Sequence, residues 1–156
     1  MKKDGIKVVT KNKKARYDYE ILSTHEAGLV LLGTEIKSIR AGLIQLKDGY
    51  VRIQGSEAFL HEVYIAPYPN AGPFNHDPTR PRKLLLHKRE IRRLYGKIQE
   101  KGLALVPLSL YLKNSKAKVE LGVGKGKRKY EKREAIKRQD AKREIQRTLR
   151  QRTKET

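Results

Sequence analysis

The side chains best suited to chemistry in this sequence are cations, which occur in several short clusters. Residues 11–17 hold four cations, one asparagine and one tyrosine within seven positions. Cations bind phosphate groups, while asparagine and tyrosine can hydrogen-bond to or stack on unpaired bases. A lone basic run of this kind is more often a solvated arm. Further basic residues at 80–83 and at Lys116 and Lys118 favour another interpretation, in which several segments assemble one RNA-binding patch.

Groups that could catalyse a reaction or hold a metal are scattered along the chain. There is no cysteine, and none of the four histidines has the spacing of a metal ligand beside an acidic cluster. We interpret the triplet Asn75, His76 and Asp77 as a polar loop tip. The carboxylates are expected to be solvated or salt-bridged surface groups, namely Asp18, Glu20, Glu26, Glu35 and Asp48. We therefore expect no metal, no cofactor and no enzymatic activity.

The composition indicates a polyanionic partner. The chain has 156 residues and a formal net charge of +20, from 37 basic and 17 acidic residues. This charge on a small body attracts nucleic acid or an anionic membrane surface. No apolar run approaches the ~20 residues that cross a bilayer, and no apolar stretch follows the basic N-terminus as in a secretion signal. We expect a cytoplasmic protein without a membrane partner.

The elements that must position the cations are mostly strands. Residues 1–124 form the predicted body, where short apolar runs alternate with polar residues. Three hairpins are predicted, pairing 17–21 with 27–32, 50–53 with 58–65, and 103–112 with 117–123. Pro107 lacks an amide donor, so its strand must be an edge strand or carry a bulge. Many short strands predict a mainly β fold, a small OB-like closed barrel with flanking short helices.

Two segments break the strand pattern and are predicted to be helices. Residues 34–42 and 88–101 both have apolar side chains at helical spacing and a glycine where the helix would stop. Residues 67–81 hold five of the six prolines and are predicted to be a long loop without regular structure.

The apolar run 84–86 has two interpretations. It can be a strand buried on both faces, as short apolar runs often are. Alternatively, Leu85 points outward and forms an apolar shelf for a base or sugar next to the cations Arg82 and Lys83. The pattern of the residues favours the buried strand.

The segment 125–156 is predicted to be a separate basic tail. Its sizeable apolar residues are too few to offset the cost of ordering a backbone, about 1–2 kcal/mol per residue, so we expect it to be disordered alone. It is rich in helix formers, which predicts a helix once a partner neutralises its charge. Its basic pairs recur every five residues and so surround a helix on all sides. That suits a channel walled by phosphates; a floppy solvated tail is the alternative.

Several motifs together resemble one known family. They are residues 12–16 (Asn-Lys-Lys-Ala-Arg), 26–28 (Glu-Ala-Gly), 33–42, 77–80, 82–87, 105–108 and 124–127. In this order they are similar to small protein B, the tmRNA-binding (SsrA-binding) proteins of bacterial trans-translation. The match covers nearly the whole chain and reverses the preference for Leu85, which becomes an outward-facing contact.

The resemblance implies a function in ribosome rescue. It implies an OB-like barrel that binds the tRNA-like domain of tmRNA and escorts alanyl-tmRNA to ribosomes stalled on messages without a stop codon. The elongation factor that delivers aminoacyl-tRNA is then an indirect partner. The tail is implied to fold in the empty message channel near the decoding centre, against small-subunit ribosomal RNA, and we expect a monomer.

Two sets of site residues follow. The motifs match family positions that contact or support tmRNA at Asn12, Glu26, Leu85 and Lys118, and the basic clusters add Lys13, Lys14, Arg16, Arg82 and Lys83. The set expected at the decoding centre is Gly126, Lys127, Arg128, Glu131, Lys132, Arg133, Lys137 and Arg138. Glu26 has the wrong charge for a phosphate, so its expected role is a hydrogen bond to a base or a 2′-OH, or fixing nearby cations. Glu131 stands where the family commonly has aspartate.

Two other classes of protein fit the same basic body and tail. A structural ribosomal protein would remain bound to subunits at all times. A small RNase would cleave RNA in trans.

Overall fold

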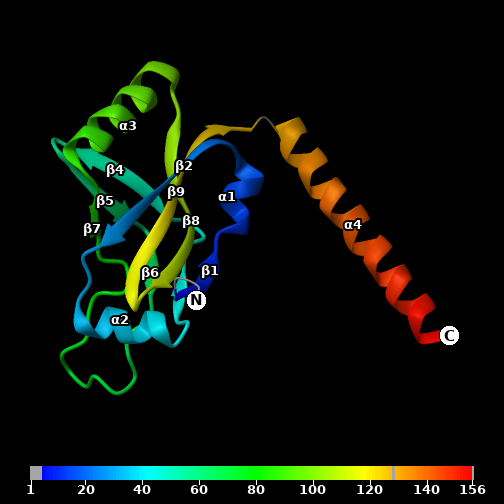
Figure 1. Cartoon of the computed structure of the whole chain (residues 1–156), viewed down its shortest axis with the longest axis horizontal. Coiled ribbons are helices and arrows are strands. Elements are labelled where there is room, and N and C mark those ends of the chain that lie inside the picture. The colour runs from blue at the N-terminus through cyan, green and yellow to red at the C-terminus, as the bar shows by residue number, and fades with distance from the viewer. Residues whose placement is uncertain (1–4, 128, 156) are drawn as a thin grey trace.

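The architecture is a long antiparallel sheet accompanied by helices. The computed structural model describes residues 5–127 and 129–155, with side chains for all of these except 100–101, 129–136 and 151–155. The strands of the main sheet run in the order β1-β8-β9-β2-β7-β5-β4 (Figure 1). Their bounds are β1 (Ile6–Lys11), β2 (Tyr19–Leu29), β4 (Tyr50–Gln54), β5 (Glu57–His61), β7 (Arg82–Leu85), β8 (Ala104–Lys113) and β9 (Lys116–Gly126). A second, two-stranded sheet pairs β3 (Ile44–Gln45) with β6 (Tyr64–Ile65).

The main sheet does not close, so the prediction of a closed barrel is wrong. β1 and β4 are its two end strands, and within residues 5–127 no ladder of backbone hydrogen bonds joins them. β1 ends where Asn12 caps a helix, before it can pair further. The seam is bridged by a side chain instead, because the Asn12 amide donates to the carbonyls of Leu46 at 3.1 Å and Pro107 at 2.9 Å.

The predicted hairpins have mixed outcomes. The first is wrong, because residues 19–29 are one strand that pairs with β9 along its length, with a bulge between Ile21 and Ser23. The third is confirmed as β8–β9. The second is confirmed as β4–β5, but its predicted strand 58–65 is divided, because β5 ends at His61 and Tyr64–Ile65 form β6 of the second sheet. β8 lies between β1 and β9 and shifts register between Pro107 and Ser109, so Pro107 sits in a bulge of an inner strand.

Both predicted helices are present, and a third was not foreseen. α2 (Gly33–Arg40) and α3 (Lys88–Lys101) match the predicted segments, and α3 ends at Gly102 with a left-handed φ of 60°. The unforeseen helix is α1 (Lys13–Asp18), whose Ala15 amide donates to Asn12 Oδ1 at 3.1 Å. Its six residues carry no amphipathic repeat, so the capping asparagine was the signal available for it.

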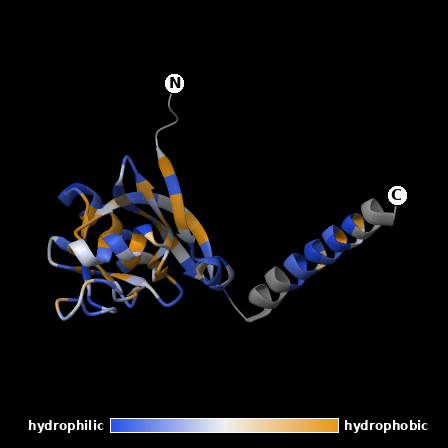
Figure 2. Cartoon of the chain, turned by 90° about the horizontal axis from the view of Figure 1, so that it is seen from below, coloured by the Kyte–Doolittle hydropathy of each residue, from blue (hydrophilic) through white to orange (hydrophobic). Residues whose placement is uncertain are grey.

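The core lies between the inner face of the sheet and helices α2 and α3. Buried residues include Ile39 of α2, Leu94 of α3 and Leu110 of β8. Figure 2 shows apolar residues concentrated in the body, while the described part of the C-terminal helix is almost uniformly polar. Among the described helices, none is long and apolar enough to cross a membrane.

The predicted loop 67–81 contains no helix or strand, as expected. The interpretation of Asn75, His76 and Asp77 as a polar loop tip is wrong for His76. Its ring is buried and bonds to the Thr34 hydroxyl at 2.8 Å and to the Ile65 carbonyl at 2.9 Å. This histidine therefore anchors the loop to α2 and β6.

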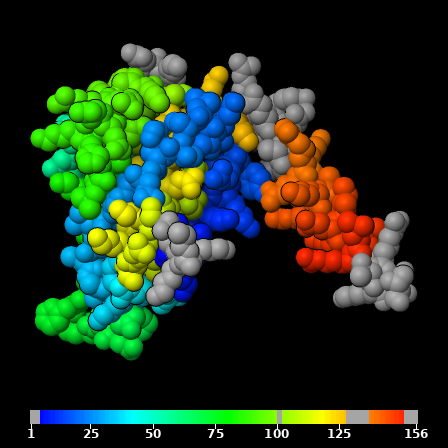
Figure 3. Space-filling view, viewed as in Figure 1, coloured from blue at the N-terminus to red at the C-terminus, as the bar shows by residue number. Residues whose placement is uncertain are grey.

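The chain leaves the body beside α1. β9 continues to Gly126, two residues past the predicted end of the body. The Lys127 amide donates to the Asp18 carbonyl at 2.9 Å, and Lys127 Nζ donates to the Arg16 carbonyl at 3.2 Å. α4 (Lys129–Glu155) then extends away from the body (Figures 1 and 3). Whether its helix depends on a partner stays a prediction.

Candidate nucleic-acid interface

The outward face of the sheet brings predicted contact residues into one row. Strand register places Leu85 of β7 opposite Gly28 of β2, Gly28 opposite Lys118 of β9, and Lys118 opposite Tyr111 of β8. Leu84 is 1% exposed and Leu85 is 55% exposed, so β7 is buried on one face and the buried-both-sides interpretation is wrong. Leu85 is an apolar shelf on the surface.

Gly28 allows this row to form. A Cβ at Gly28 would lie 3.3 Å from both Cβ and Cδ1 of Leu85, and 3.6 Å from Lys118 Nζ. Because Gly28 has no side chain, Leu85 and Lys118 can meet above β2. Gly28 is not among the predicted site residues, although a glycine inside a strand pattern signals a close approach.

The row borders a hollow of about 390 Å³, which also takes in Glu26, Leu86, His87 and Glu90. Three of the predicted tmRNA residues therefore come together here, namely Glu26, Leu85 and Lys118. An apolar shelf beside an ammonium group can hold the face of a base and a neighbouring phosphate.

Glu26 of β2 is held in place by two residues of β8, the strand on the far side of β9. Its Oε2 accepts a hydrogen bond from the Tyr111 hydroxyl, and Lys113 Nζ is 3.7 Å from Oε1. Burial and the carboxylates of Glu26 and Glu120 raise the pKa of Tyr111, so the phenol remains a donor. The tyrosine thus fixes the orientation of the carboxylate.

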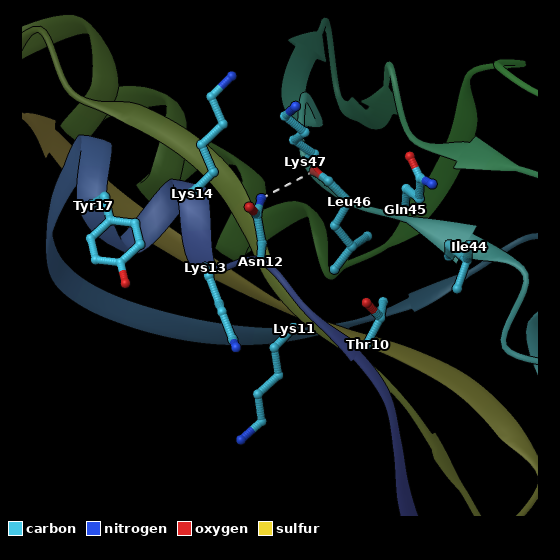
Figure 4. Close-up of a pocket in the computed structure, with 10 residues that line it drawn as sticks. All are labelled: Thr10, Lys11, Asn12, Lys13, Lys14, Tyr17, Ile44, Gln45, Leu46 and Lys47. Atoms are coloured by element: carbon cyan, nitrogen blue, oxygen red, sulfur yellow. Dashed lines mark hydrogen bonds between the residues drawn. The ribbon is translucent and has the colours of Figure 1, made fainter. Parts of the chain in front are cut away.

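A second hollow, of about 560 Å³, lies at the open seam of the sheet (Figure 4). Lys14 and Lys47 extend to one side of Asn12 in this view, and Lys11 and Lys13 to the other. Its remaining lining is Thr10, Tyr17, Ile44, Gln45 and Leu46. None of the described residues that line it is acidic, so its charge suits a phosphate backbone.

Asn12 is placed as a supporting residue. It is 3% exposed, and its side chain is engaged with Leu46, Pro107 and Ala15. It therefore holds α1 and its lysines at the seam instead of reaching solvent. Lys14 is partly engaged, with Nζ 3.1 Å from Asp48 Oδ1.

A third hollow shares one lining residue with each of the other two. It has a volume of about 500 Å³ and is lined by Lys11 of the seam hollow and Glu26 of the Leu85 hollow. The rest of its lining is Ile6, Val8, Arg16, Leu108, Ser109, Tyr111 and Glu120. Arg16 itself lies 3.7 Å from Glu120. We call the surface formed by these three neighbouring hollows, from the seam hollow to Leu85, the sheet track.

Arg82 is not part of the sheet track, and its prediction as an RNA contact is wrong. It is fully buried, with Nε 2.6 Å from Glu35 Oε2 and a second bond to the Val63 carbonyl at 2.6 Å. Glu35, expected at the surface, is equally buried and also accepts from Arg80 at 2.5 Å. Alternating burial along β7 explains this, because Arg82 shares the inward face with Leu84, whereas Lys83 points out.

Burial alone would raise the pKa of Glu35. Hydrogen bonds from Arg80, the Leu32 amide and Arg82 outweigh that effect, and the pKa is lowered overall. For Arg82, burial lowers the pKa and Glu35 opposes the shift. The network joins α2 to the start of β7 and is structural.

The basic face of α3 is a further charged surface, whose residues are not among the predicted site residues. Arg89, Arg92 and Arg93 are exposed, while Ile91 and Leu94 pack inward. The helix begins beside the Leu85 hollow, which His87 and Glu90 line. Cations three and four residues apart along the sequence were the available signal.

The residues predicted for the decoding centre are only partly described. Gly126 ends β9, Lys127 contacts α1, and Lys137 and Arg138 are exposed on α4. Arg128 lies outside the described residues, as do the side chains of Glu131, Lys132 and Arg133. Among the described side chains, no group of three or more potential metal ligands occurs.

Comparison with known proteins decides the family. A family model described as "SmpB protein" matches residues 9–151. The chain belongs to the SmpB protein family. The resemblance drawn from the motifs is confirmed.

Members of the family in other organisms match along almost the entire chain. An SsrA-binding protein of Geobacillus thermodenitrificans is 58% identical over 154 residues, covering 99% of both chains. That of Thermosynechococcus vestitus is 56% identical, over 96% of this chain and 99% of its own. A solved structure described as "tmRNA-SmpB: a journey to the center of the bacterial ribosome" is 49% identical, with a TM-score of 0.66, and covers 83% of this chain and 94% of its own.

Proposed function

We propose that this chain binds tmRNA through its tRNA-like domain and delivers alanyl-tmRNA to stalled ribosomes in trans-translation. The observation that carries the proposal is the row of Leu85, Gly28 and Lys118 beside Glu26, which forms one surface from three strands. The proposal is supported by the SsrA-binding name of relatives near 57% identity and by the likeness to a tmRNA-SmpB complex.

The sheet track supplies the means of binding. Lys11, Lys13, Lys14 and Lys118 bind phosphates, and Leu85 contacts an unpaired base or sugar. Lys83, exposed on the same strand as Leu85, adds a cation at its edge. The protein contributes binding and no chemistry, acts in the cytoplasm where ribosomes work, and functions as a monomer with the elongation factor as an indirect partner.

The tail has a separate task. A 27-residue helix such as α4 is about 40 Å long at 1.5 Å per residue. Its cations face all sides, which fits a channel whose walls are phosphates. We propose that Lys127, Arg128 and the cations up to Arg138, with Gly126 and Glu131, lie near the decoding centre, and that contact with small-subunit ribosomal RNA stabilises the helix.

Filter binding with labelled tmRNA tests the first task. With ~6–10 phosphate contacts, affinity falls roughly 10³–10⁵-fold between 50 and 200 mM salt. Leu85→Ala weakens binding, whereas Leu22→Ala, an equally exposed leucine away from the hollows, does not. A flat salt titration, or equal affinities for the two variants, contradicts the proposal.

Deletion of residues 131–156 tests the second task. The shortened chain keeps tmRNA affinity within a few-fold and loses peptide tagging on stalled ribosomes. A large loss of affinity contradicts the division of tasks.

The rival classes give different results in the same experiments. A structural ribosomal protein is present in one copy on purified ribosomes that lack tmRNA. A small RNase cleaves the labelled tmRNA during incubation.

A further inference from the structure

Phe74 is the most exposed large apolar side chain among the described residues. It is 88% exposed, whereas the next, Ile145 on α4, is 62% exposed. It belongs to the loop tip, residues 69–74, of the long green loop that projects below α2 in Figure 1. Single apolar residues on a surface are ordinary, but a phenyl ring almost wholly in water gives up the free energy of its own burial. What the ring can do depends on how firmly the loop holds it and on the charge around it.

The base of the loop 67–81 is fixed to the body by buried groups. His76 is buried and bonds to side chain and backbone groups of α2 and β6. The buried Arg82 donates to the carbonyls of Asp77 and Pro78 at 3.3 and 3.1 Å. The loop therefore starts from a rigid support.

Asn75 closes the loop tip above this base. Its Oδ1 accepts from the Tyr68 amide at 3.1 Å, and its Nδ2 donates to the Tyr68 carbonyl at 2.9 Å. The Ala71 amide donates to the same carbonyl at 3.1 Å, and Pro69 and Pro73 each fix one backbone dihedral angle. The loop tip is thus shaped before any partner binds, which lowers the entropy that binding would cost.

The sequence around Phe74 is poor in cations. Residues 53–79 contain neither lysine nor arginine, and the loop tip carries no charge, although the whole chain has a net charge of +20. Lys37 of α2 stands over the Tyr68 ring at 5.6 Å, and Arg80, the next cation along the chain, is paired with buried Glu35. A phosphate backbone binds to cations, so this loop tip favours a protein partner, in contrast to the sheet track.

We propose that Phe74 anchors the body to the stalled ribosome by inserting into an apolar pocket on a ribosomal protein. This proposal rests on the proposed function, which brings the chain to the ribosome. Aromatic side chains are enriched in protein interfaces, where a few anchors in pockets supply most of the binding energy. Proteins that coat RNA have basic surfaces. An uncharged loop tip fits a pocket with a basic rim, which would repel the cations elsewhere on this chain.

Photo-crosslinking from position 74 identifies the partner. The full chain carries p-benzoyl-phenylalanine in place of Phe74, and a stalled complex is assembled from purified ribosomes, alanyl-tmRNA and the elongation factor. The matched control carries the same residue in place of Leu22, an exposed apolar residue outside the loop. We expect one ribosomal protein to crosslink from position 74 and not from position 22, with the crosslink mapping to an apolar pocket.

Variants of the loop tip measure the contribution of the ring. Phe74→Ala weakens binding of the tmRNA-bound chain to stalled ribosomes roughly 10–100-fold, because the apolar ring is no longer buried. Phe74→Leu keeps most of the affinity. Asn75→Ala keeps the ring but removes both bonds to Tyr68, so it loses less affinity than Phe74→Ala. Because the ring is exposed in the free chain, Phe74→Ala leaves the urea midpoint and the tmRNA affinity at their wild-type values.

Three results of the ribosome experiments overturn the proposal. They are a crosslink from position 74 to RNA or to the elongation factor, no crosslink to any component, and wild-type binding of Phe74→Ala to stalled ribosomes. A loss of tmRNA affinity in Phe74→Ala also overturns it, because that result places the ring on the RNA-binding surface. Failure of wild type to bind tmRNA removes the proposed function instead, and it is measured before ribosomes are added.

Discussion

Replacement of Arg82 by alanine separates a structural arginine from an RNA contact. The change removes the 2.6 Å bond to Glu35 and bonds to the carbonyls of Val63, Pro78 and Asp77. Removing one partner of a buried ion pair costs about 3–5 kcal/mol. Because Arg80 still pairs with Glu35 at 2.5 Å, we expect the lower part of this range, about 3–4 kcal/mol.

Urea unfolding followed by circular dichroism measures the effect. With an m-value of about 2 kcal/mol per molar urea, the midpoint falls by roughly 1.5–2 M. The affinity of the folded fraction for tmRNA stays within a few-fold of wild type. The matched control is Lys83→Ala on the next residue, which is exposed; it leaves the midpoint unchanged and weakens RNA binding. A structural role for Arg82 is refuted if Arg82→Ala keeps the wild-type midpoint and loses RNA affinity.

Two further predictions follow from particular side chains. Gly28→Val pushes Leu85 and Lys118 apart and lowers tmRNA affinity at least 10-fold. The urea midpoint changes little, since valine suits a strand. The control Gly33→Val lies in open space and leaves binding unchanged, and equal affinities for both variants would contradict the role of Gly28. The lowered pKa of Glu35 makes its stabilising contribution complete above the ordinary value of 4.5 and lost as the pH falls through the folded-state value. The difference in melting temperature between wild type and Glu35→Gln is therefore constant near neutral pH and shrinks in acid, and a difference that grows in acid would oppose the assignment.

Local patterns predicted much of the fold. The glycine at 102 and the apolar spacing before it were enough to place α3, and turn residues at 113–116 were enough to place β8–β9. Residues 17–32 were misread because a polar stretch within a strand looks like a turn, whereas pairing with β9 over the whole length decides the outcome. Local patterns also could not show that the sheet stays open, because closure depends on which strands meet across the seam at Asn12.

The residues of the candidate site were likewise predicted only in part. Leu85 and Lys118 were found through motifs, and strand register explains why they meet. Arg82 was misassigned because alternation along β7 points it inward, and the sequence shows two adjacent cations without showing which one is buried. Glu35 was missed as its partner because the two are 47 positions apart. Gly28 and Tyr111 act through neighbours on adjacent strands, which a single sequence does not reveal.

Amide chemical-shift mapping tests the central claim most directly. The ¹⁵N-labelled full chain is titrated with the tRNA-like domain of tmRNA at low salt. We predict that the largest shifts fall on the sheet track, at residues 11–14, 26–28, 85 and 118–120. Shifts concentrated instead on the loop 67–81 or on α2, with the sheet track unchanged, would contradict the account.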